Sequence, residues 1–519
     1  MAWLNTGQIL EVHARKFPNK VALKDWRGKR LTYQELDLRT NRLANGLLDL
    51  GLRNGDRVAV LLHNCAEFVE IYCAFAKVGL VAVPVNWRFI GREIEYVVSN
   101  SDSKAMIVGE EFVEVVDSIR SNLEKVDPQR YIVVGRSTPE GYINYETLIV
   151  NSSDSKPKVK VSSKDTWAQI YTSGTTGVPK GVVRSHESYI SFYLINAVEF
   201  GFSEKDYGMI IMPLYHVNST FYGPLFLYIG ASLYVGRDEG FAPVELLRVV
   251  SEEKVTFTSL IPTHYNLILN VSDEEFRKYD ASSIRKLLCS SAPVRSHTKK
   301  GILKWFPNVE LYEAYGSTEA GLVTILKPED QLRKLGSMGR ECLGTDKIKL
   351  LDEDGNEVSV GNVGELYSCG PMMFDEYYRL PEKTKRSFKG DFFTARDMVK
   401  RDEEGYYYIV DRKDNMIITG GEHVYPSEVE EVISRHSKIF DVAVIGVPDD
   451  KWGEAVKAVV VLKEDETATE EEIIEWCRGQ LAGFKKPKSV DFISDSDMPR
   501  TTTGKILHRK LRERYAEPF

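Results

Sequence analysis

Residues 171–183 read YTSGTTGVPKGVV and gather hydroxyl groups and glycine amides into one short stretch. Backbone amides freed by glycine, together with side-chain hydroxyls, can surround phosphate oxygens from several directions, and a lysine adds positive charge. The stretch follows the strand-like AQIYT and precedes a helix-like segment from about residue 186. It is a candidate polyphosphate loop, with contacts expected from Thr172, Ser173, Gly174, Thr175, Thr176, Gly177 and Lys180.

Two other interpretations of this stretch remain open from the residues alone. A flexible Ser/Thr/Gly surface loop has the same composition. A Walker A loop requires Gly-x4-Gly-Lys-Ser/Thr, whereas Pro179 and Gly181 flank Lys180 here, so the loop is not of that type. A kinase or another phosphotransferase would also bind polyphosphate, and it would release ADP rather than pyrophosphate.

The elements that must position this loop alternate β-branched runs with helical periods. Thr32-Tyr-Gln-Glu35 is a capping-box pattern that predicts a helix ending near Gly51. A helix-like stretch at 66–77 separates two of the strand-like runs, which lie at 58–62, 81–85, 209–212, 232–235, 256–261 and 286–289. Strands separated by helices predict an α/β fold with parallel sheets covered on both faces.

The pattern changes from about residue 344 onward. Short strands with turns at Asp354-Gly355 and near Glu404-Gly405 predict a small β-rich module. After Arg412 a compact α+β segment follows, with helices near 427–437 and 469–482 and a strand pair near 442–463. We expect two domains, 1–411 and 412–519.

Length, charge and cysteine usage narrow the class of protein. A chain of 519 residues exceeds the size of a single core, and 68 basic against 76 acidic residues give a net charge of −8, which disfavours a nucleic-acid partner. The six cysteines have no metal-ligand spacing and predict buried thiols in a reducing compartment. The N-terminus lacks a signal-peptide layout, and no apolar run reaches the ~18 residues needed to span a bilayer. We expect a cytoplasmic protein.

Further motifs follow the loop in one order along the chain, between residues 289 and 513. They are CSSAPV at 289–294, YEAYGSTEAG at 312–321, DFFTARDMV at 391–399, IVDRKDNMIITGGEHVYPSEVE at 409–430 and PRTTTGKILHRKLRE at 499–513. Alone, Gly-Ser-Thr-Glu fits a helix start and Asp411 to Asp414 a charged turn. Together with the loop they resemble the adenylate-forming superfamily of acyl-CoA synthetases, peptide-synthetase adenylation domains and luciferases, over essentially the whole chain.

This resemblance implies both an architecture and a reaction. The N-terminal domain would hold two doubly wound sheets plus the β-rich module, and the small α+β C-terminal domain would be mobile. The reaction would convert a carboxylic acid and ATP, with Mg²⁺, into an acyl-adenylate and pyrophosphate. Coenzyme A would then form the thioester and release AMP, which makes the chain an AMP-forming acyl-CoA ligase.

The resemblance also assigns roles to individual residues. Lys505 would be the catalytic lysine, Thr318 would bind the α-phosphate and Glu319 would hold Mg²⁺. The adenine contacts would be Ala292, Pro293, Glu313 and Tyr315. The ribose contacts would be Asp397 and Arg412. The hinge would be Asp414, and the loop that meets coenzyme A would hold Gly420, Gly421 and Glu422. Arg396 stands where the family usually has glycine, and Ser290 and Ser291 replace two family glycines; Arg396 has no assigned role.

The acid-binding residues follow from the same resemblance. His216 matches a histidine at the acyl-tunnel mouth, although a satisfied core histidine is equally compatible with its sequence. The other wall positions would be Tyr222, Ile261, His264, Ser291 and Gly316. Acetate-specific relatives have tryptophan where this chain has Gly316, so we expect a medium-chain aliphatic or cyclic acid larger than propionate.

Several alternatives to a free-standing acyl-CoA ligase stay open. The chain could load a carrier protein, act on aryl acids, or oxidise the adenylate as luciferases do. From another class, it could be a catalytically silent nucleotide-binding regulator, which the joint presence of Glu319, Asp397, Arg412 and Lys505 disfavours. Relatives are often dimers, so a homodimer is an open expectation, but the sequence holds no dimerisation motif.

Overall fold

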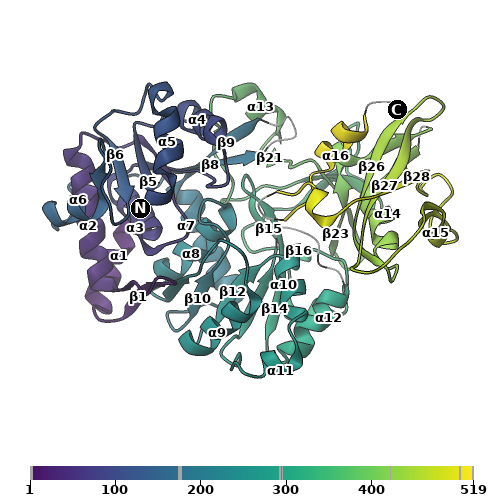
Figure 1. The fold of residues 1–519 in the computed structure, drawn as a ribbon, viewed down its shortest axis with the longest axis horizontal. Coiled ribbons are helices and arrows are strands. Elements are labelled where there is room, and N and C mark those ends of the chain that lie inside the picture. Colours follow the sequence, from purple (N-terminus) through teal and green to yellow (C-terminus); the bar gives the residue numbers. More distant parts are fainter. Residues whose placement is uncertain are drawn as a thin grey trace. The chain divides into compact units, whose positions relative to one another are not determined.

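A computed structural model describes residues 4–173, 178–290, 294, 296–420, 422–501 and 504–516 of the chain, without the Ser173 side chain. The chain divides into two compact units (Figure 1). Unit 1 comprises residues 1–336, 341–347 and 369–391, and unit 2 comprises 337–340, 348–368 and 392–519. Some of the predicted site residues lie outside the described residues. They are Gly174–Gly177 of the predicted phosphate loop, the predicted adenine and acyl-pocket residues Ser291, Ala292 and Pro293, and Gly421.

Two large sheets form the framework of unit 1. Among the described residues the first sheet has nine strands, in the order β16 (Arg340–Glu341), β15 (Gly321–Leu326), β14 (Glu310–Ser317), β13 (Lys286–Cys289), β12 (Phe257–Leu260), β10 (Tyr207–Ile210), β11 (Ser232–Val235), β1 (Val21–Asp25) and β2 (Arg30–Thr32). The described part of the second sheet has eight strands, in the order β19 (Glu376–Tyr377), β9 (Pro179–Ser185), β8 (Thr166–Ser173), β4 (Val81–Pro84), β3 (Arg57–Leu61), β5 (Ala105–Gly109), β6 (Tyr131–Val134) and β7 (Ile143–Asn144).

Helices cover both faces of these sheets, as the sequence predicts. One core cluster joins apolar side chains of both sheets to α1, α2, α3, α7 and α8, while α9, α10 and α12 cover the far face of the first sheet and α4 and α5 that of the second. Their bounds are α1 Thr6–Lys16, α2 Tyr33–Asp49, α3 Ala66–Val78, α4 Gly91–Asn100, α5 Val113–Ile119, α6 Tyr145–Asn151, α7 His186–Phe200, α8 Val217–Tyr228, α9 Pro243–Glu253, α10 Pro262–Leu269, α11 Asp273–Phe276, α12 Ser296–Trp305 and α13 Pro381–Arg386; short 3₁₀ turns lie at Glu110–Phe112, Arg120–Asn122 and Pro328–Asp330.

Local signals in the sequence account for most of these elements. The capping box predicted at Thr32 and Glu35 begins α2, with the two side-chain-to-backbone bonds in place. The strands predicted at 232–235 and 286–289 are β11 and β13. The strand expected before the phosphate loop is β8, and the helix expected from about residue 186 is α7; β9, which was not expected, lies between the loop and α7 and pairs antiparallel with β8. The loop therefore joins two strands of one hairpin.

Unit 2 combines a β module with an α+β segment. The module sheet runs β17 (Lys349–Leu351), β18 (Val363–Tyr367), β22 (Asp397–Arg401) and β23 (Tyr407–Arg412), in antiparallel pairs. The second sheet runs β25 (Glu422–Val424), β24 (Ile417–Thr419), β27 (Gly453–Leu462) and β26 (Ile439–Asp449), with β28 (Ser489–Phe492) on β27. The helices are α14 (Pro426–Ile433), α15 (Glu470–Trp476) and α16 (His508–Tyr515), and short elements lie at Phe392–Phe393 (β21), Lys413–Asn415 and Asp495–Asp497; the short strand β20 (Phe388–Lys389) belongs to unit 1.

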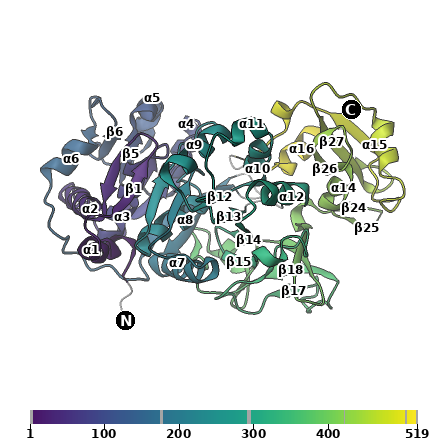
Figure 2. The same cartoon turned by 90° about the horizontal axis from the view of Figure 1, so that it is seen from below.

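The long hairpin β26–β27 carries the core of the α+β segment (Figure 2). Alternate residues point to opposite faces of a strand. Val442 and Val444 accordingly pack with α14 and α15, and Ala443 and Ile445 pack toward α16. The domain boundary predicted between residues 411 and 412 was placed where a mobile C-terminal domain would begin, and it stays a prediction. None of the helices in the described ranges is both long and apolar enough to cross a bilayer.

Candidate active site

The strands that flank the phosphate loop place Thr172 and Lys180 opposite each other. The two residues are Cα partners in the β8–β9 hairpin, and both are half-buried. The Thr172 hydroxyl oxygen is buried and has no hydrogen-bond partner among the described residues. A buried hydroxyl left in this way fits a loop that receives an external hydrogen-bonding group, such as a phosphate oxygen.

Tyr377, to which no sequence motif points, links the strand after the phosphate loop to Glu319. Its strand β19 pairs with β9, which brings residue 377 opposite Val182. The Lys180 ammonium lies over the Tyr377 ring, 4.4 Å from the centroid, and the Tyr377 hydroxyl donates to Glu319 Oε1 over 2.8 Å. The predicted phosphate-binding lysine and the predicted metal-binding carboxylate therefore share one aromatic neighbour.

Arg184 anchors the turn that carries Thr318 and Glu319. It is fully buried in β9; one guanidinium nitrogen donates to the Thr318 carbonyl over 2.5 Å and the other to the Met372 carbonyl. Burial lowers the pKa of Arg184. Thr318 and Glu319 form the turn between β14 and β15, not the start of a helix. An arginine inside the apolar run VVRSH is the signal that sequence reasoning passed over.

The adenine-side residues are only partly described. Tyr315 is half-buried on β14, and the buried Glu313 carboxylate forms an ion pair with Lys299 of α12, 2.6 Å away. Desolvation raises the pKa of Glu313 although Lys299 opposes the shift. The Glu313 side chain is thus engaged inside the protein, and its part in adenine binding stays a prediction. Lys299 carried no signal in the sequence, because it lies in an ordinary amphipathic helix.

His216 begins α8 and is a neutral imidazole near pH 7. Burial lowers its pKa to about 4, and its Nδ1 accepts from the Asn218 backbone N–H over 3.3 Å. A neutral ring with an accepting Nδ1 carries its proton on Nε2, which is then a hydrogen-bond donor. The Asn218 amide donates to the hydroxyls of Ser259 and Ser290, each over 2.9 Å. These contacts connect the start of α8 with the ends of β12 and β13.

The remaining acyl positions differ in their surroundings. Ile261 caps α10, and His264 on that helix stacks on Phe241 with ring centroids 4.1 Å apart and 14° between the planes. Burial lowers the pKa of His264 to about 4. Tyr222 lies in an aromatic core cluster and is 4% exposed. A Cβ at Gly316 would lie 2.0 Å from the Gly321 carbonyl oxygen, so the β14–β15 hairpin itself requires this glycine.

Unit 2 contains the residues predicted to bind ribose and coenzyme A, the predicted hinge residue and the predicted catalytic lysine. Asp397 and Arg412 are partners across β22 and β23, and Arg412 Nε lies 3.2 Å from Asp397 Oδ1. Glu422 begins β25, and Gly420 has a positive φ of 59° and donates its N–H to the Trp452 carbonyl. The Asp414 carboxylate pairs with Arg396 over 3.0 Å.

Lys505 lies on the loop before α16 and interacts electrostatically with Arg412 and Asp397, the residues predicted to bind ribose. Its N–H donates to the Thr501 hydroxyl over 3.1 Å. Lys505 is exposed, and desolvation by the surrounding protein, then repulsion from Arg412, lower its pKa to about 8. Asp397 and Asp411 act in the opposite direction. The ammonium of Lys505 is therefore close to its titration range at physiological pH.

The described residues contain no group of three or more His, Cys, Asp or Glu side chains arranged to hold a metal ion. Glu319, the predicted metal-binding residue, is a carboxylate linked through Tyr377 to the phosphate-loop hairpin. A Mg²⁺ ion that takes most of its ligands from substrate phosphates and water needs only one or two protein carboxylates. The residues present therefore fit a nucleotide-borne Mg²⁺ rather than a metal cage.

Comparison with known proteins agrees with this arrangement. The AMP-binding enzyme family matches residues 10–378, and the C-terminal domain of AMP-binding enzymes matches residues 428–505. The chain is 35% identical to a long-chain-fatty-acid–CoA ligase, FadD13, of Mycobacterium tuberculosis over 99% of both chains. It is 34% identical to a feruloyl-CoA synthase of an Amycolatopsis species over 97% of both chains. Its structure resembles the anthranilate CoA ligase AuaEII in complex with anthranoyl-AMP, with a TM-score of 0.90, 28% identity and coverage of 99% and 98%.

Replacement of Arg184 by methionine tests its role as an anchor. We expect ATP binding to weaken by roughly tenfold, because the Thr318 carbonyl loses a charged donor and the turn loses its fixed position. Arg184→Lys, which keeps a cation and a donor, should fall between wild type and Arg184→Met. Calorimetric titration with ATP measures the effect, and thermal unfolding without ligand shows whether both variants remain folded. Equal ATP affinity in all three folded proteins would contradict the assignment.

Proposed function

The chain belongs to the AMP-binding enzyme family as an AMP-forming acyl-CoA synthetase, and we propose that its acid is a medium-chain aliphatic or cyclic carboxylic acid larger than propionate. The enzyme joins a carboxylic acid to coenzyme A at the expense of ATP. The observation that carries the substrate proposal is Gly316, where acetate-specific members have tryptophan. The close approach of Gly321 gives this glycine a second, structural reason, so the size of the acid has to be measured.

Aryl acids are a second candidate substrate class, and a separate observation supports it. The flat stack of Phe241 on His264 and the polar contacts of Asn218 with Ser259 and Ser290 would suit an aromatic ring with polar substituents. Two relatives act on such acids by name, the feruloyl-CoA synthase and the anthranilate CoA ligase. An aryl adenylate would place its ring against the aromatic face and its substituents toward the serine hydroxyls.

In the proposed first half-reaction the acid attacks the α-phosphorus of ATP and pyrophosphate leaves. The hydroxyls and amides of residues 172–177 and Lys180 would bind the phosphates, and Thr318 would bond the α-phosphate. Bound at Glu319, Mg²⁺ would neutralise phosphate charge. His216 would donate its Nε2 proton to the incoming carboxylate as a hydrogen bond. Lys505 would bridge carboxylate and phosphate, and Asp397 and Arg412 would bind the ribose.

In the proposed second half-reaction the part of the chain after Asp414 rotates about that residue and withdraws Lys505. The loop at 420–422 would then meet coenzyme A, whose thiol attacks the acyl carbon and releases AMP. Use of one mobile segment for both steps requires that Lys505 act in only one of them. A carrier protein in place of coenzyme A, and a homodimer, remain open to the same assays.

An acid panel tests the proposal directly. Pyrophosphate and AMP would be measured with ATP and Mg²⁺, with and without coenzyme A, for acetate, propionate, octanoate, cyclohexanecarboxylate, palmitate, benzoate and ferulate. We expect coenzyme A-dependent AMP release to peak above propionate, at octanoate or the cyclic acid. A peak at benzoate or ferulate would favour the aryl candidate. A peak at acetate would refute both, and pyrophosphate release without coenzyme A turnover would indicate a carrier-protein acceptor.

Lys505 should act on adenylate formation alone. Two unit charges 4 Å apart repel by roughly 4 kcal/mol at an effective dielectric of 20, and loss of an offset of that size slows a reaction about a thousandfold. We therefore expect Lys505→Ala to reduce adenylate formation by about that factor and to spare thioester formation from supplied acyl-AMP. Equal loss of both steps would contradict the two-step division of labour.

The lowered pKa of Lys505 gives this assignment a pH signature. Because the protonated amine is the active form and its pKa is about 8, kcat/KM for adenylate formation should fall as pH rises above about 8. Arginine stays protonated in this pH range. The residual kcat/KM of Lys505→Arg should therefore not fall with a midpoint near pH 8. An identical pH profile for wild type and Lys505→Arg would assign the titration to another group.

Glu319 is expected to set the Mg²⁺ requirement. Glu319→Gln removes the negative charge while keeping a similar shape, so the Mg²⁺ concentration for half-maximal adenylate formation should rise. Glu329→Gln, which changes an exposed carboxylate of the same unit, is the matched control. A Mg²⁺ titration of Glu319→Gln that coincides with that of the control would remove Glu319 from the metal site.

A further inference from the structure

Arg396 adopts a backbone conformation that arginine rarely takes. Its φ is +65°, in the left-handed region that glycine enters without penalty and other residues enter at a cost. Glycine is the residue that the resembled family usually has at this position. A side chain retained in a strained conformation requires contacts that compensate the strain, and these often belong to function.

The backbone of Arg396 is part of a closed ring of hydrogen bonds that reaches the hinge. Its N–H donates to the Thr394 hydroxyl over 2.8 Å, and that hydroxyl donates to Glu365 Oε1 over 2.9 Å. The Arg396 carbonyl accepts from the Lys413 N–H over 2.9 Å, and Lys413 Nζ pairs with Glu365 Oε2 at 3.0 Å. The turn at 394–397 and the start of the hinge are therefore held together as one piece.

The Arg396 side chain extends this connection to the hinge carboxylate. Its guanidinium lies 3.0 Å from Asp414 Oδ1. The Asp414 carbonyl in turn accepts from Arg512 of α16 over 2.7 Å, and the same Arg512 nitrogen donates to Asn415 Oδ1 over 2.9 Å. Because α16 directly follows the Lys505 loop, a chain of contacts runs from Arg396 through Asp414 and Arg512 to the element that carries the lysine.

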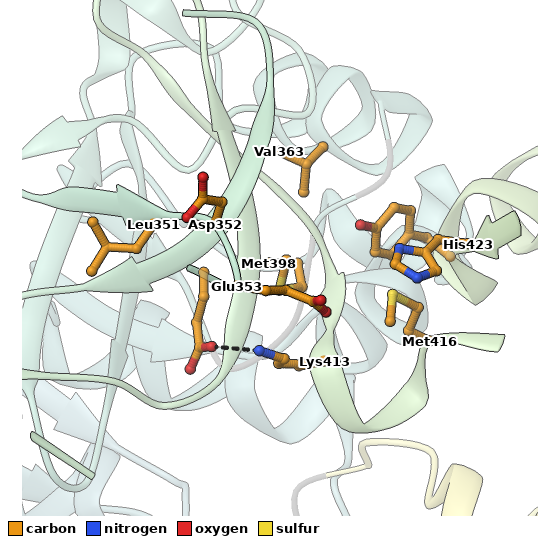
Figure 3. A pocket seen from close by; sticks show the side chains of 10 residues that line it. Leu351, Asp352, Glu353, Val363, Met398, Lys413, Met416 and His423 are labelled. Carbon is orange, nitrogen blue, oxygen red and sulfur yellow. Dashed lines mark hydrogen bonds and ion pairs between the residues drawn. The ribbon is translucent and has the colours of Figure 1, made fainter. Parts of the chain in front are cut away.

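Each residue of the segment 412–414 has a partner of opposite charge. Arg412 pairs with Asp397, Lys413 with Glu365 and Asp414 with Arg396. The Lys413–Glu365 pair lines a cavity of about 140 Å³. Lys413, Met398, Met416 and His423 are seen around this cavity in Figure 3. Of these three ion pairs, the one made by Arg396 reaches Asp414, so the Arg396 side chain is placed to bias the hinge residue itself.

We propose that Arg396 is a positioning residue that holds Asp414, and through Arg512 the Lys505 loop, in the arrangement required for adenylate formation. This inference rests on the proposed function, in which Lys505 serves only the first half-reaction and Asp414 is the hinge. Arg396 then sets the ratio of the two half-reactions without touching either substrate. The ion pair is partly exposed, with side-chain exposures of 55% for Arg396 and 28% for Asp414, so salt weakens it.

Three variants separate the effect of the Arg396 charge from the effect of its strained backbone conformation. Arg396→Ala removes the guanidinium and keeps a residue that is strained at positive φ, Arg396→Lys keeps a cation, and Arg396→Gly removes both charge and strain. Arg435→Ala deletes another exposed ion pair of unit 2, with Glu431 on α14, and serves as the matched control. Each protein is assayed for pyrophosphate release without coenzyme A and for thioester formation from supplied acyl-AMP, with the acid preferred in the panel.

We expect Arg396→Ala and Arg396→Gly to lower the ratio of adenylate formation to thioester formation by about two- to fivefold, the range of an exposed ion pair. Arg396→Lys should retain most of the wild-type ratio at low salt, and Arg435→Ala should match wild type. Raising the ionic strength to about 0.5 M should move the wild-type ratio toward that of Arg396→Ala, whose own ratio should respond less.

Equal changes in both half-reactions, or a ratio in Arg396→Ala that matches the Arg435→Ala control, would overturn the inference. Failure of Arg396→Lys to exceed Arg396→Ala would do the same, because the ion pair would then have no part in the effect. The proposed function fails differently, since the wild-type enzyme would then lack one or both half-reactions with every acid of the panel. Thermal unfolding of the four variants confirms that the comparison is made on folded protein.

Discussion

Repulsion between an anionic acid and the phosphates of ATP is the constraint on which the arrangement of this chain depends. Cations and N–H donors must face the nucleotide, and each of them is costly to hold in a partly dry site. The chain distributes them between its units, with Lys180 and the phosphate loop in unit 1 and Arg412 and Lys505 in unit 2. Under the proposed mechanism Lys505 leaves after the first step, whereas Arg412, which precedes the hinge residue Asp414, stays with the nucleotide.

The turn at Thr318 and Glu319 shows how the protein interior holds residues that would face the phosphates. Arg184 is a fully buried cation, and its lowered pKa expresses the desolvation it suffers. In return it satisfies two main-chain carbonyls, one of them at the turn that would face the α-phosphate. Tyr377 performs a related task from the opposite strand, because it contacts both Lys180 and Glu319. The predicted site residues are thus held by side chains that would not touch substrate.

The sequence predicted the parts of this structure that depend on local patterns. Strand and helix alternation predicted parallel sheets covered by helices, the family resemblance implied two of them, and the capping box at Thr32 located the start of α2 correctly. The strand β9 was missed. The Tyr377 contact was missed because the pairing of β9 with β19 joins segments almost two hundred residues apart and leaves no periodic signal in either. The role of Arg396 was also beyond prediction, since a backbone φ cannot be read from a residue type that normally avoids it.

The backbone strain of Arg396 and the weak ion pair of its side chain are similar in energy. This explains why arginine suits a hinge better than a residue with a stronger interaction would. The left-handed conformation costs a non-glycine residue roughly 1–2 kcal/mol, and an exposed ion pair contributes roughly 0.2–1 kcal/mol. The side chain alone therefore does not compensate the strain, and the hydrogen bonds among Glu365, Thr394 and Lys413 must supply the difference. A hinge held by such a narrow balance can open in every turnover. A glycine would remove both contributions and leave the position of Asp414 to the rest of the chain, whereas arginine makes that position depend on charge.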